Sequence, residues 1–431
     1  MGEYKINPQK LKGEVKVPPS KSMAHRAIIC AALSEGESII KNVDFSDDIK
    51  ATLDSMIKLG AKASVKEDTL YIKGISKDSE LGDKEVVIDC NESGSTLRFI
   101  VPIALMRYGK TKFIGRGNLG KRPLKTYYDI FDLQNIKYSH KEGVLDLKTE
   151  GQLKSGIFKV RGDISSQFIT GLLFVLPLLD GDSKIEITTN MESKGYIDMT
   201  LKAIKDFGVT IVNNDYKEFI IKGNQKYKNK DYKVEADYSQ AAFYLCADAL
   251  NNEVYADDLS KDSLQGDKEV IDVLERMGVK FSYKDSSLIG KVSGTLKGTV
   301  IDGSQCPDII PVLALVCALS EGKSKIINAE RLRIKECDRL KAVTEELNKL
   351  GADIKETEDG LIINGVSSLK GGTTVWSHKD HRIAMTLAVA ATVCSEQIVI
   401  KDYECVSKSY PDFWKDYISL GGCINEWNDR K

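Results

Sequence analysis

A repeat of about 72 residues runs through the whole chain and constrains its fold more than any other sequence feature. At six points, small or acidic residues stand directly before an apolar run with helical periodicity, and successive points are 71 to 73 residues apart. The six starts lie at Ser20, Ser93, Ser165, Asp237, Asp308 and Asp380. Serine and aspartate are typical helix N-caps. A chain of this kind is predicted to build one supersecondary unit six times.

A second helix is predicted later in each unit, because an amphipathic run recurs there and usually ends on glycine. The helix ends are Leu59-Gly60, Phe207-Gly208, Met277-Gly278, Leu350-Gly351 and Leu420-Gly421. Glycine suits the left-handed position that follows a helix. The second copy differs, because Gln134-Asn135-Ile136 stands where the glycine should be. With a short strand such as Leu70 to Gly74 after the second helix, each unit is too small to bury its apolar face alone.

The length of 431 residues predicts two domains of about 200 residues each, because one ordinary core does not grow that large. Six units divide naturally as three plus three. The strand-like start from Tyr4 to Val17 precedes the first unit, so we expect it to pair with the second half of the chain. The predicted domains are residues 1–17 with 235–431, which hold repeats four to six, and residues 18–234, which hold repeats one to three.

Composition excludes several classes of function. The chain has 62 Lys and Arg against 63 Asp and Glu, and a net charge of −1 gives no general attraction to nucleic acid or to acidic membranes. Nine scattered cysteines without a C-x-x-C pair indicate reduced thiols in a cytoplasmic protein. The sequence has no run of 18 uncharged apolar residues, so it indicates no membrane span. It has four histidines, and these do not suggest a metal site. We expect a monomer without metal or cofactor.

Cations stand at helix starts, where the helix dipole favours carboxylates. Lys21 and Arg26 lie in or beside the first turn of unit one, Arg98 in that of unit two, and His381 and Arg382 in that of unit six. Cations at the positive ends of several helices make physical sense if an anion occupies the space beside them. The pattern therefore predicts a binding site for phosphate and carboxylate groups.

The strongest cationic pattern is the row of Arg331, Lys335 and Arg339, which recur at i, i+4 and i+8. A helix through this segment would stack the three on one line with no carboxylate in the row. Such a row costs about 0.2–0.5 kcal/mol per pair, so we interpret it as a site for an anion that is not protein. A solvated basic face relieved by Glu336 and Asp338 is the alternative.

Hydroxyl and amide side chains at other helix starts can bind the same anions. Ser22 shares a face with Arg26, and Ser165, Ser166 and Gln167 offer side-chain donors together with backbone N–H groups. Each serine taken alone is as well explained as an N-cap. The recurrence of such residues at one structural position favours the functional interpretation.

On these residues the sequence resembles the enolpyruvyl transferase family, over essentially the whole chain. Several long, mutually spaced motifs carry the resemblance. They are Pro19 to Ala27, Ser93 to Arg98, Lys121-Arg122-Pro123, Gly162 to Phe168, Ser193 to Asp198, Pro307-Asp308, Arg333 to Arg339, Asp380 to Met385 and Ser407 to Asp412. The resemblance implies an α/β fold with two domains, each of three βαβαββ units, arranged like an inside-out α/β barrel.

The motifs are most similar to those of the branch that transfers the enolpyruvyl group of phosphoenolpyruvate to the 5-hydroxyl of shikimate 3-phosphate, with release of phosphate. This branch belongs to the shikimate pathway toward aromatic amino acids and is the target of glyphosate. The resemblance implies that shikimate 3-phosphate is bound by Lys21, Ser22, Arg26, Ser165, Ser166, Gln167, Ser193, Tyr196, Asp308, Arg331 and Lys335. It implies that phosphoenolpyruvate is bound by Lys21, Gly94, Arg122, Gln167, Arg339, Arg382 and Lys408.

The implied reaction puts a proton on the vinyl carbon and removes one from the hydroxyl, through a tetrahedral intermediate. Asp308 is the candidate that takes the hydroxyl proton, because an aspartate amid cations stays ionised. Glu336 is the candidate that protonates the methylene carbon, and Lys21 is the alternative. Glu92 stands where many relatives carry asparagine, and the position of Arg331 varies among them, so their effects on binding stay open.

Two other functions are alternatives. UDP-N-acetylglucosamine enolpyruvyl transferase has the same fold but uses a cysteine near the Arg122 region, and residues 111–123 contain none. A ring clamp built from repeats would need a strongly basic inner surface, which a net charge of −1 does not favour.

Overall fold

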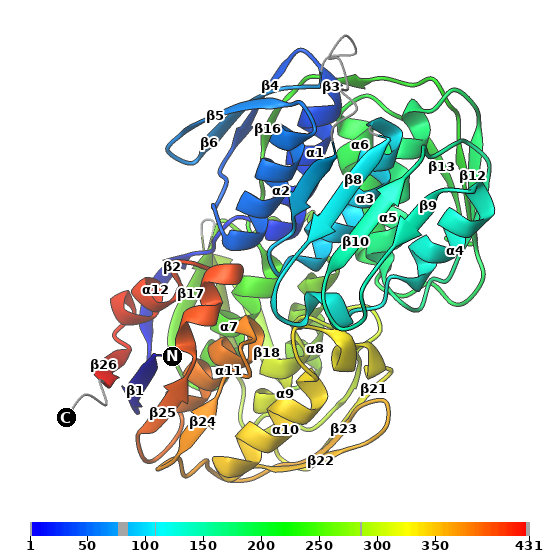
Figure 1. The fold of residues 1–431 in the computed structure, drawn as a ribbon. Helices are drawn as coiled ribbons and strands as arrows, with labels where there is room; N and C mark the ends of the chain where they lie inside the picture. The colour runs from blue at the N-terminus through cyan, green and yellow to red at the C-terminus, as the bar shows by residue number, and fades with distance from the viewer. Residues whose placement is uncertain (1, 76–84, 108, 285–286, 428–431) are drawn as a thin grey trace. The chain divides into compact units, whose positions relative to one another are not determined.

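The computed structural model describes residues 2–75, 85–107, 109–284 and 287–427 (Figure 1). The chain divides into two compact units, residues 1–20 with 235–431, and residues 21–234. The first boundary falls three residues later than the sequence predicted, because Pro19 pairs with Ala236 and the N–H of Ser20 donates to the carbonyl oxygen of Glu235 at 2.7 Å.

The unit of residues 21–234 contains three repeats in the order βαβαββ. The first comprises β16 (Asp231–Lys233), α1 (Lys21–Leu33), β4 (Glu37–Lys41), α2 (Asp47–Lys58), β5 (Lys62–Lys66) and β6 (Thr69–Lys73). The second comprises β7 (Val86–Asp89), α3 (Gly94–Arg107), β8 (Lys110–Ile114), α4 (Lys125–Gln134), β9 (Lys137–Ser139) and β10 (Asp146–Glu150). The third comprises β11 (Ile157–Val160), α5 (Ser166–Val175), β12 (Ser183–Ile187), α6 (Lys194–Asp206), β13 (Ile211–Asn214) and β14 (Glu218–Ile221). Shorter elements are β3 (Ser34–Glu35), η1 (Gly117–Lys121), η2 (Leu176–Leu178) and β15 (Tyr227–Lys228).

The other unit contains three repeats of the same order. The fourth comprises β2 (Lys12–Lys16), α7 (Tyr238–Ala249), β17 (Glu253–Asp257), α8 (Glu269–Arg276), β18 (Val279–Lys284) and β19 (Ser287–Val292). The fifth comprises β20 (Val300–Asp302), α9 (Ile310–Ala318), β21 (Lys323–Ile327), α10 (Arg339–Lys349), β22 (Asp353–Glu356) and β23 (Leu361–Asn364). The sixth comprises β24 (Thr374–Trp376), α11 (His381–Ala391), β25 (Ile398–Lys401), α12 (Phe413–Ser419), β26 (Cys423–Trp427) and β1 (Glu3–Asn7). Three 3-10 segments complete it, η3 (Gly266–Lys268), η4 (Glu330–Ile334) and η5 (Tyr403–Lys408).

Every repeat forms one four-stranded sheet in which the first and second strands are parallel and the remaining pairs are antiparallel. Three sheets are completed by strands that are remote in sequence. Strand β16 lies parallel to β4, β2 lies parallel to β17, and β1 lies between β25 and β26. The predicted α/β class and six repeats are confirmed, as is the pairing of the N-terminal strands with the second half of the chain.

Each unit has its own hydrophobic core. The first helix of each repeat is the most deeply placed, as the apolar runs predicted, and every residue of α9 is buried. Helix α3 packs on α5, and α7 and α9 pack on α11 (Figure 1). Among the described residues, no helix is both long and apolar enough to cross a membrane.

The predicted glycines end the second helices in the left-handed region. Gly60, Gly208, Gly278, Gly351 and Gly421 have φ values between +86° and +110°. In the second repeat Asn135, with φ of 55°, takes the same conformation at the end of α4. Asparagine tolerates this region better than other non-glycine residues, so the divergent copy keeps the same helix end.

The predicted helical row of Arg331, Lys335 and Arg339 is wrong. Segment η4 ends before Lys335, whose backbone is extended with φ of −83° and ψ of −151°, and α10 begins only at Arg339. The side chain of Asp338 accepts a hydrogen bond from the N–H of Lys341 at 3.1 Å and so caps α10. This cap starts a new helix, and repulsion within the row would further disfavour a continuous one.

Candidate functional site

Arg339 is the centre of a buried cluster at the start of α10. Its Nε donates to Asp380 Oδ2 at 2.7 Å, Nη1 to Asp308 Oδ1 at 2.9 Å, and Nη2 to Glu336 Oε2 at 2.7 Å. Burial alone would lower the pKa of Arg339, but the three carboxylates raise it well above its ordinary value. Arg339 is therefore paired with protein carboxylates, contrary to the interpretation of the cationic row. Two of them, Asp308 and Asp380, come from chain segments far apart in sequence, and Glu336 is three residues away.

Asp308 is contacted by three cations. Besides Arg339, Lys335 Nζ lies 3.4 Å from Oδ1 and Arg382 Nη2 lies 3.5 Å from Oδ2. Burial favours the neutral acid, yet these three cations lower the pKa of Asp308 well below its ordinary value. Burial also lowers the pKa of Lys335, against the opposing effect of Asp308. Asp308 is thus a carboxylate at neutral pH, as the sequence predicted, and a weak base while its cations are not neutralised.

Asp380 and Arg382 fix the start of α11 to this cluster. Asp380 Oδ1 accepts the N–H of Arg382 at 2.8 Å and so caps α11, while both of its oxygens accept from Arg339. Arg382 donates to the carbonyl oxygen and to Oγ of Ser239, each at 2.7 Å, which ties α11 to α7. The recurring N-cap position was the sequence signal at Asp380, but nothing local indicated that it binds Arg339.

Two other candidates of this unit are Arg331 and Lys408. Arg331 is mostly buried and donates from Nη2 to the carbonyl oxygen of Ser304 at 3.0 Å. Lys408 is 7% exposed and ends η5, which packs on α11. The structure therefore brings Asp308, Lys335 and Glu336 together with Arg339 and Arg382, and leaves the roles of Arg331 and Lys408 as predictions.

In the other unit, Arg26 joins α1 to α6. Its Nε donates to Thr200 Oγ1 at 2.9 Å, Nη1 to the carbonyl oxygen of Ser22 at 2.6 Å, and Nη2 to that of Tyr196 at 2.9 Å. Burial lowers the pKa of Arg26 to about 10. All three bonds end on neutral oxygens, so they leave the positive charge of the guanidinium uncancelled.

Lys21, the first residue of α1, forms an ion pair with Asp48 of α2. Nζ and Oδ2 are 3.0 Å apart, and the two side chains are 16% and 6% exposed. The sequence did not identify Asp48, because the pairing depends on how α1 packs on α2. Also on α1, His25 Nδ1 lies 2.8 Å from Thr52 Oγ1, which lies 2.7 Å from Thr96 Oγ1. Burial lowers the pKa of His25 to about 3, so a neutral chain of polar groups joins α1, α2 and α3.

Gly94, Arg122 and Gln167 meet at the starts of α3 and α5. A Cβ on Gly94 would lie 2.6 Å from Arg122 Nη1 and 3.6 Å from Gln167 Oε1. Gln167 accepts from Arg98 Nη1 at 2.6 Å and donates to Ser95 Oγ at 2.9 Å. Three of the residues implied for phosphoenolpyruvate are therefore neighbours. Arg122 can approach this closely because Gly94 has no side chain.

The remaining candidates of this unit lie at helix starts. Ser165 Oγ accepts the N–H of Gln167 at 3.3 Å and caps α5, so its N-cap role is confirmed. Ser166 is the first residue of α5 and is buried. Ser193 precedes α6 in the left-handed region, with φ of 53°. The carboxylate of Glu92 lies against Gly117, in the segment that leads to Arg122.

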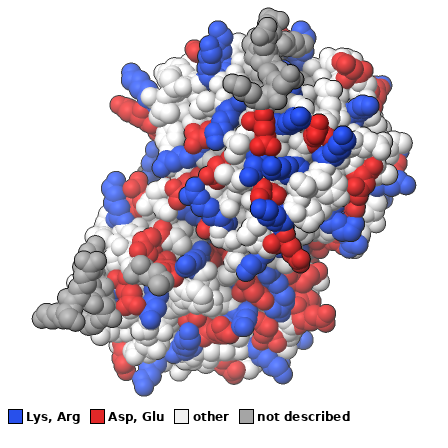
Figure 2. Space-filling model, viewed as in Figure 1, with Lys and Arg blue, Asp and Glu red and all other residues white. Residues whose placement is uncertain are grey.

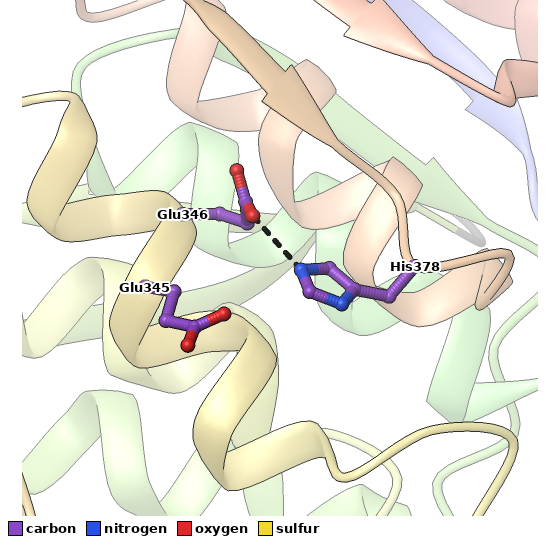
Figure 3. Close-up of side chains that lie close together, drawn as sticks. All are labelled: Glu345, Glu346 and His378. Carbon is purple, nitrogen blue, oxygen red and sulfur yellow. Dashed lines mark hydrogen bonds and ion pairs between the residues drawn. The ribbon is translucent and has the colours of Figure 1, made fainter.

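One group among the described residues has its potential ligand atoms within 4.8 Å of one another, as a metal site requires. It consists of Glu345, Glu346 and His378 (Figure 3). Both oxygens of Glu346 already accept hydrogen bonds from Lys349 Nζ, at 2.9 and 2.8 Å. A metal ion would have to displace this ammonium group, so the arrangement fits a salt-bridged cluster better than a metal site.

The chain is similar to known proteins over its whole length. Residues 6–417 match the family model for EPSP synthase (3-phosphoshikimate 1-carboxyvinyltransferase). It is 68% identical to the 3-phosphoshikimate 1-carboxyvinyltransferase of Clostridium beijerinckii and 63% identical to that of Clostridioides difficile, with 99% of each chain covered in both comparisons. The solved structure of EPSP synthase from Acinetobacter baumannii matches with a TM-score of 0.79 and 25% identity, covering 99% of this chain and 100% of the other.

Proposed function

The chain belongs to the EPSP synthase family, and from this we propose that the cationic side chains at its helix starts bind shikimate 3-phosphate and phosphoenolpyruvate. The reaction is transfer of the enolpyruvyl group of phosphoenolpyruvate to the 5-hydroxyl of shikimate 3-phosphate, with release of phosphate. The observation that carries the proposal is the gathering of Lys335, Arg339 and Arg382 around Asp308 in a chain whose net charge is −1. Arginines grip carboxylates and phosphates with two parallel hydrogen bonds, which suits both substrates.

We assign shikimate 3-phosphate chiefly to the starts of α1, α5 and α6. Arg26 supports this assignment, because its hydrogen bonds to Ser22 and Tyr196 hold the guanidinium in place without cancelling its charge. A fixed, charged donor loses little entropy when it binds a phosphate. Ser166 is the first residue of α5 and Ser193 directly precedes α6. The backbone N–H groups of a first helical turn do not bond within the helix and can face an anion.

We assign phosphoenolpyruvate to two groups of residues. The first group is Arg122, Gly94 and Gln167, and the second is Arg339, Arg382 and Lys408. The close approach at Gly94 supports the first group, because a backbone N–H without a neighbouring side chain is open to an anion. The second group is supported by the bonds that fix Arg339 and Arg382 through shared carboxylates. Such preorganised charges cost no rearrangement when the substrate binds.

The depressed pKa of Asp308 bears on its proposed role as the base. A carboxylate surrounded by three cations accepts a proton poorly. The substrates are multiply anionic, and their charges would offset those of Lys335 and Arg382, which raises the pKa of Asp308 once both are bound. We propose that Asp308 then takes the proton of the 5-hydroxyl of shikimate 3-phosphate, while the oxygen of this hydroxyl bonds to C2 of phosphoenolpyruvate.

We propose Glu336 as the group that protonates the methylene carbon and reclaims a proton when phosphate leaves. Its carboxylate is held by Arg339, so it must loosen this ion pair to carry a proton. Lys21, which is paired with Asp48, remains the alternative donor, since an ammonium group has a proton to give.

Phosphate release tests the proposed function. The purified protein is expected to release one phosphate per enolpyruvyl group transferred when shikimate 3-phosphate and phosphoenolpyruvate are both present, and none when either is left out. UDP-N-acetylglucosamine is expected not to replace shikimate 3-phosphate, and turnover with it would contradict the assignment.

A ring clamp is not favoured, because basic and acidic side chains are intermixed on the face shown in Figure 2.

We also propose a monomeric cytoplasmic enzyme. Light scattering on a size-exclusion column is expected to give the mass of one chain, and a dimer mass would overturn the first part of this proposal.

Replacement of Gly94 by alanine is expected to raise the KM for phosphoenolpyruvate by about tenfold and to leave the KM for shikimate 3-phosphate nearly unchanged. The new Cβ would lie 2.6 Å from Arg122 Nη1, so the guanidinium must move. Gly109→Ala is a matched control, because a Cβ there meets no atom within 4 Å. Steady-state kinetics with each substrate varied in turn measure both constants, and equal effects on the two would contradict the proposed site.

A further inference from the structure

Helix α10 carries a second fully buried charged residue on the face that presents Arg339. Glu346 lies seven residues after Arg339, two helical turns along the same face, and is 1% exposed. Its Oε1 accepts from His378 Nε2 at 2.8 Å (Figure 3). Its Oε2 accepts the backbone N–H of Trp376 at 3.0 Å. Lys349 donates to both oxygens. Glu346 therefore holds the chain between β24 and α11 as well as its own helix.

This connecting segment has an unfavourable backbone conformation. His378 and Lys379 have φ values of 52° and 56°, in the left-handed region that non-glycine residues rarely adopt. The ring of His378 stacks on that of Trp376 with centroids 4.2 Å apart, and Trp376 Nε1 donates to Asp402 at 2.9 Å. Conformations of this kind persist where the surroundings hold them, and they often occur at functional sites. The bonds from Glu346 hold this one from the α10 side.

The residue directly after the left-handed pair is Asp380. It accepts two hydrogen bonds from Arg339 and caps α11 through the N–H of Arg382. Helix α10 thus holds residues 376–382 at two points, through Glu346 at the turn and through Arg339 at the helix cap. A shift of the turn would move Asp380, and with it the two arginines that it contacts.

We propose that Glu346 is a positioning residue for phosphoenolpyruvate binding, which acts by fixing the turn before Asp380 and thereby the guanidinium groups of Arg339 and Arg382. The inference rests on the proposed function, since it needs these arginines to bind that substrate. It requires the charged form of Glu346. Burial opposes this form, but the bonds from His378, Lys349 and the Trp376 N–H outweigh burial and lower the pKa of Glu346.

The test compares Glu346→Gln with Glu345→Gln. Glu345 is the adjacent residue of α10, is exposed, and lies 3.8 Å from Lys341, so it is a matched control for the loss of one carboxylate. Glu346→Gln is expected to raise the KM for phosphoenolpyruvate by about 10- to 100-fold, the effect of a displacement of about 1 Å at a binding group. The KM for shikimate 3-phosphate is expected to change less than about twofold, and Glu345→Gln to change neither KM.

Two further variants keep the test decisive if Glu346→Gln fails to fold. His378→Leu removes one bond to Glu346 and is expected to raise the same KM, while His378→Gln, which retains an N–H donor, is expected to restore most of the wild-type value. An unchanged KM for phosphoenolpyruvate in Glu346→Gln or His378→Leu overturns the inference, and so does an equal rise in the KM values of both substrates. A wild-type protein that releases no phosphate would instead overturn the proposed function, and the inference with it.

Discussion

Replacement of Glu336 by glutamine is expected to lower turnover by about 10²–10⁴-fold, the usual contribution of a general acid or base. Glu336 Oε2 accepts from Arg339 Nη2 at 2.7 Å, and a glutamine carbonyl oxygen can accept the same bond. The substitution thus keeps the shape and the hydrogen bond and removes the transferable proton. Steady-state turnover and calorimetric binding of each substrate, measured on the same preparation, separate a loss of chemistry from a loss of binding.

The same measurements decide between the two candidate proton donors. If Glu336→Gln turns over at a near-normal rate, Glu336 leaves the mechanism and Lys21, paired with Asp48 at 3.0 Å, becomes the donor. Glu345→Gln is the control here also, because it removes a carboxylate from the same unit at an exposed position. If the control loses as much activity as Glu336→Gln, the effect is one of overall charge and the proposed role is wrong.

Replacement of Asp308 by asparagine is expected to lower turnover by a similar factor of about 10²–10⁴, because the amide cannot take the hydroxyl proton. It is also expected to destabilise the protein, because Asp308 partly compensates the charges of Lys335, Arg339 and Arg382. Breaking a buried ion pair costs about 3–5 kcal/mol. The side chain of Asp308 is 22% exposed, which places the expected loss near the lower end, at about 3 kcal/mol.

The pH dependence of stability tests the depressed pKa of Asp308 independently of catalysis. The pKa is lower in the folded protein than in the unfolded chain, where it is about 3.9, so the folded state favours the ionised form. The resulting stability is fully present above this unfolded value and is lost as the pH falls through the folded one. Wild type and Asp308→Asn are therefore expected to differ most in free energy of unfolding near pH 7 and to converge in strong acid. Urea unfolding across this pH range measures the free energy of unfolding of both proteins. If their difference did not change with pH, the pKa shift of Asp308 would be contradicted.

The sequence by itself determined the repeat and the positions of its helices. The starts at Ser20, Ser93 and Ser165 and the glycine ends such as Gly60 were predicted within a residue or two, because capping and the left-handed helix end depend on a few adjacent residues. The resemblance of the motifs then indicated the family. Residues outside the quoted motifs, such as Asp48, which pairs with Lys21, had no comparable local signal.

Only the tertiary structure decided how the charged residues pair. The expected row of Arg331, Lys335 and Arg339 failed because the single cap at Asp338 divides the segment, and sequence spacing alone does not weigh a cap against a continuous helix. The carboxylates that hold Arg339 include Asp308 and Asp380, 31 and 41 residues away along the chain. Ion pairs of this kind depend on which helices pack together, and packing depends on apolar surface that does not specify the charged partners beside it. Local structure was thus encoded residue by residue, while the electrostatics of the candidate site arose only from the assembled fold.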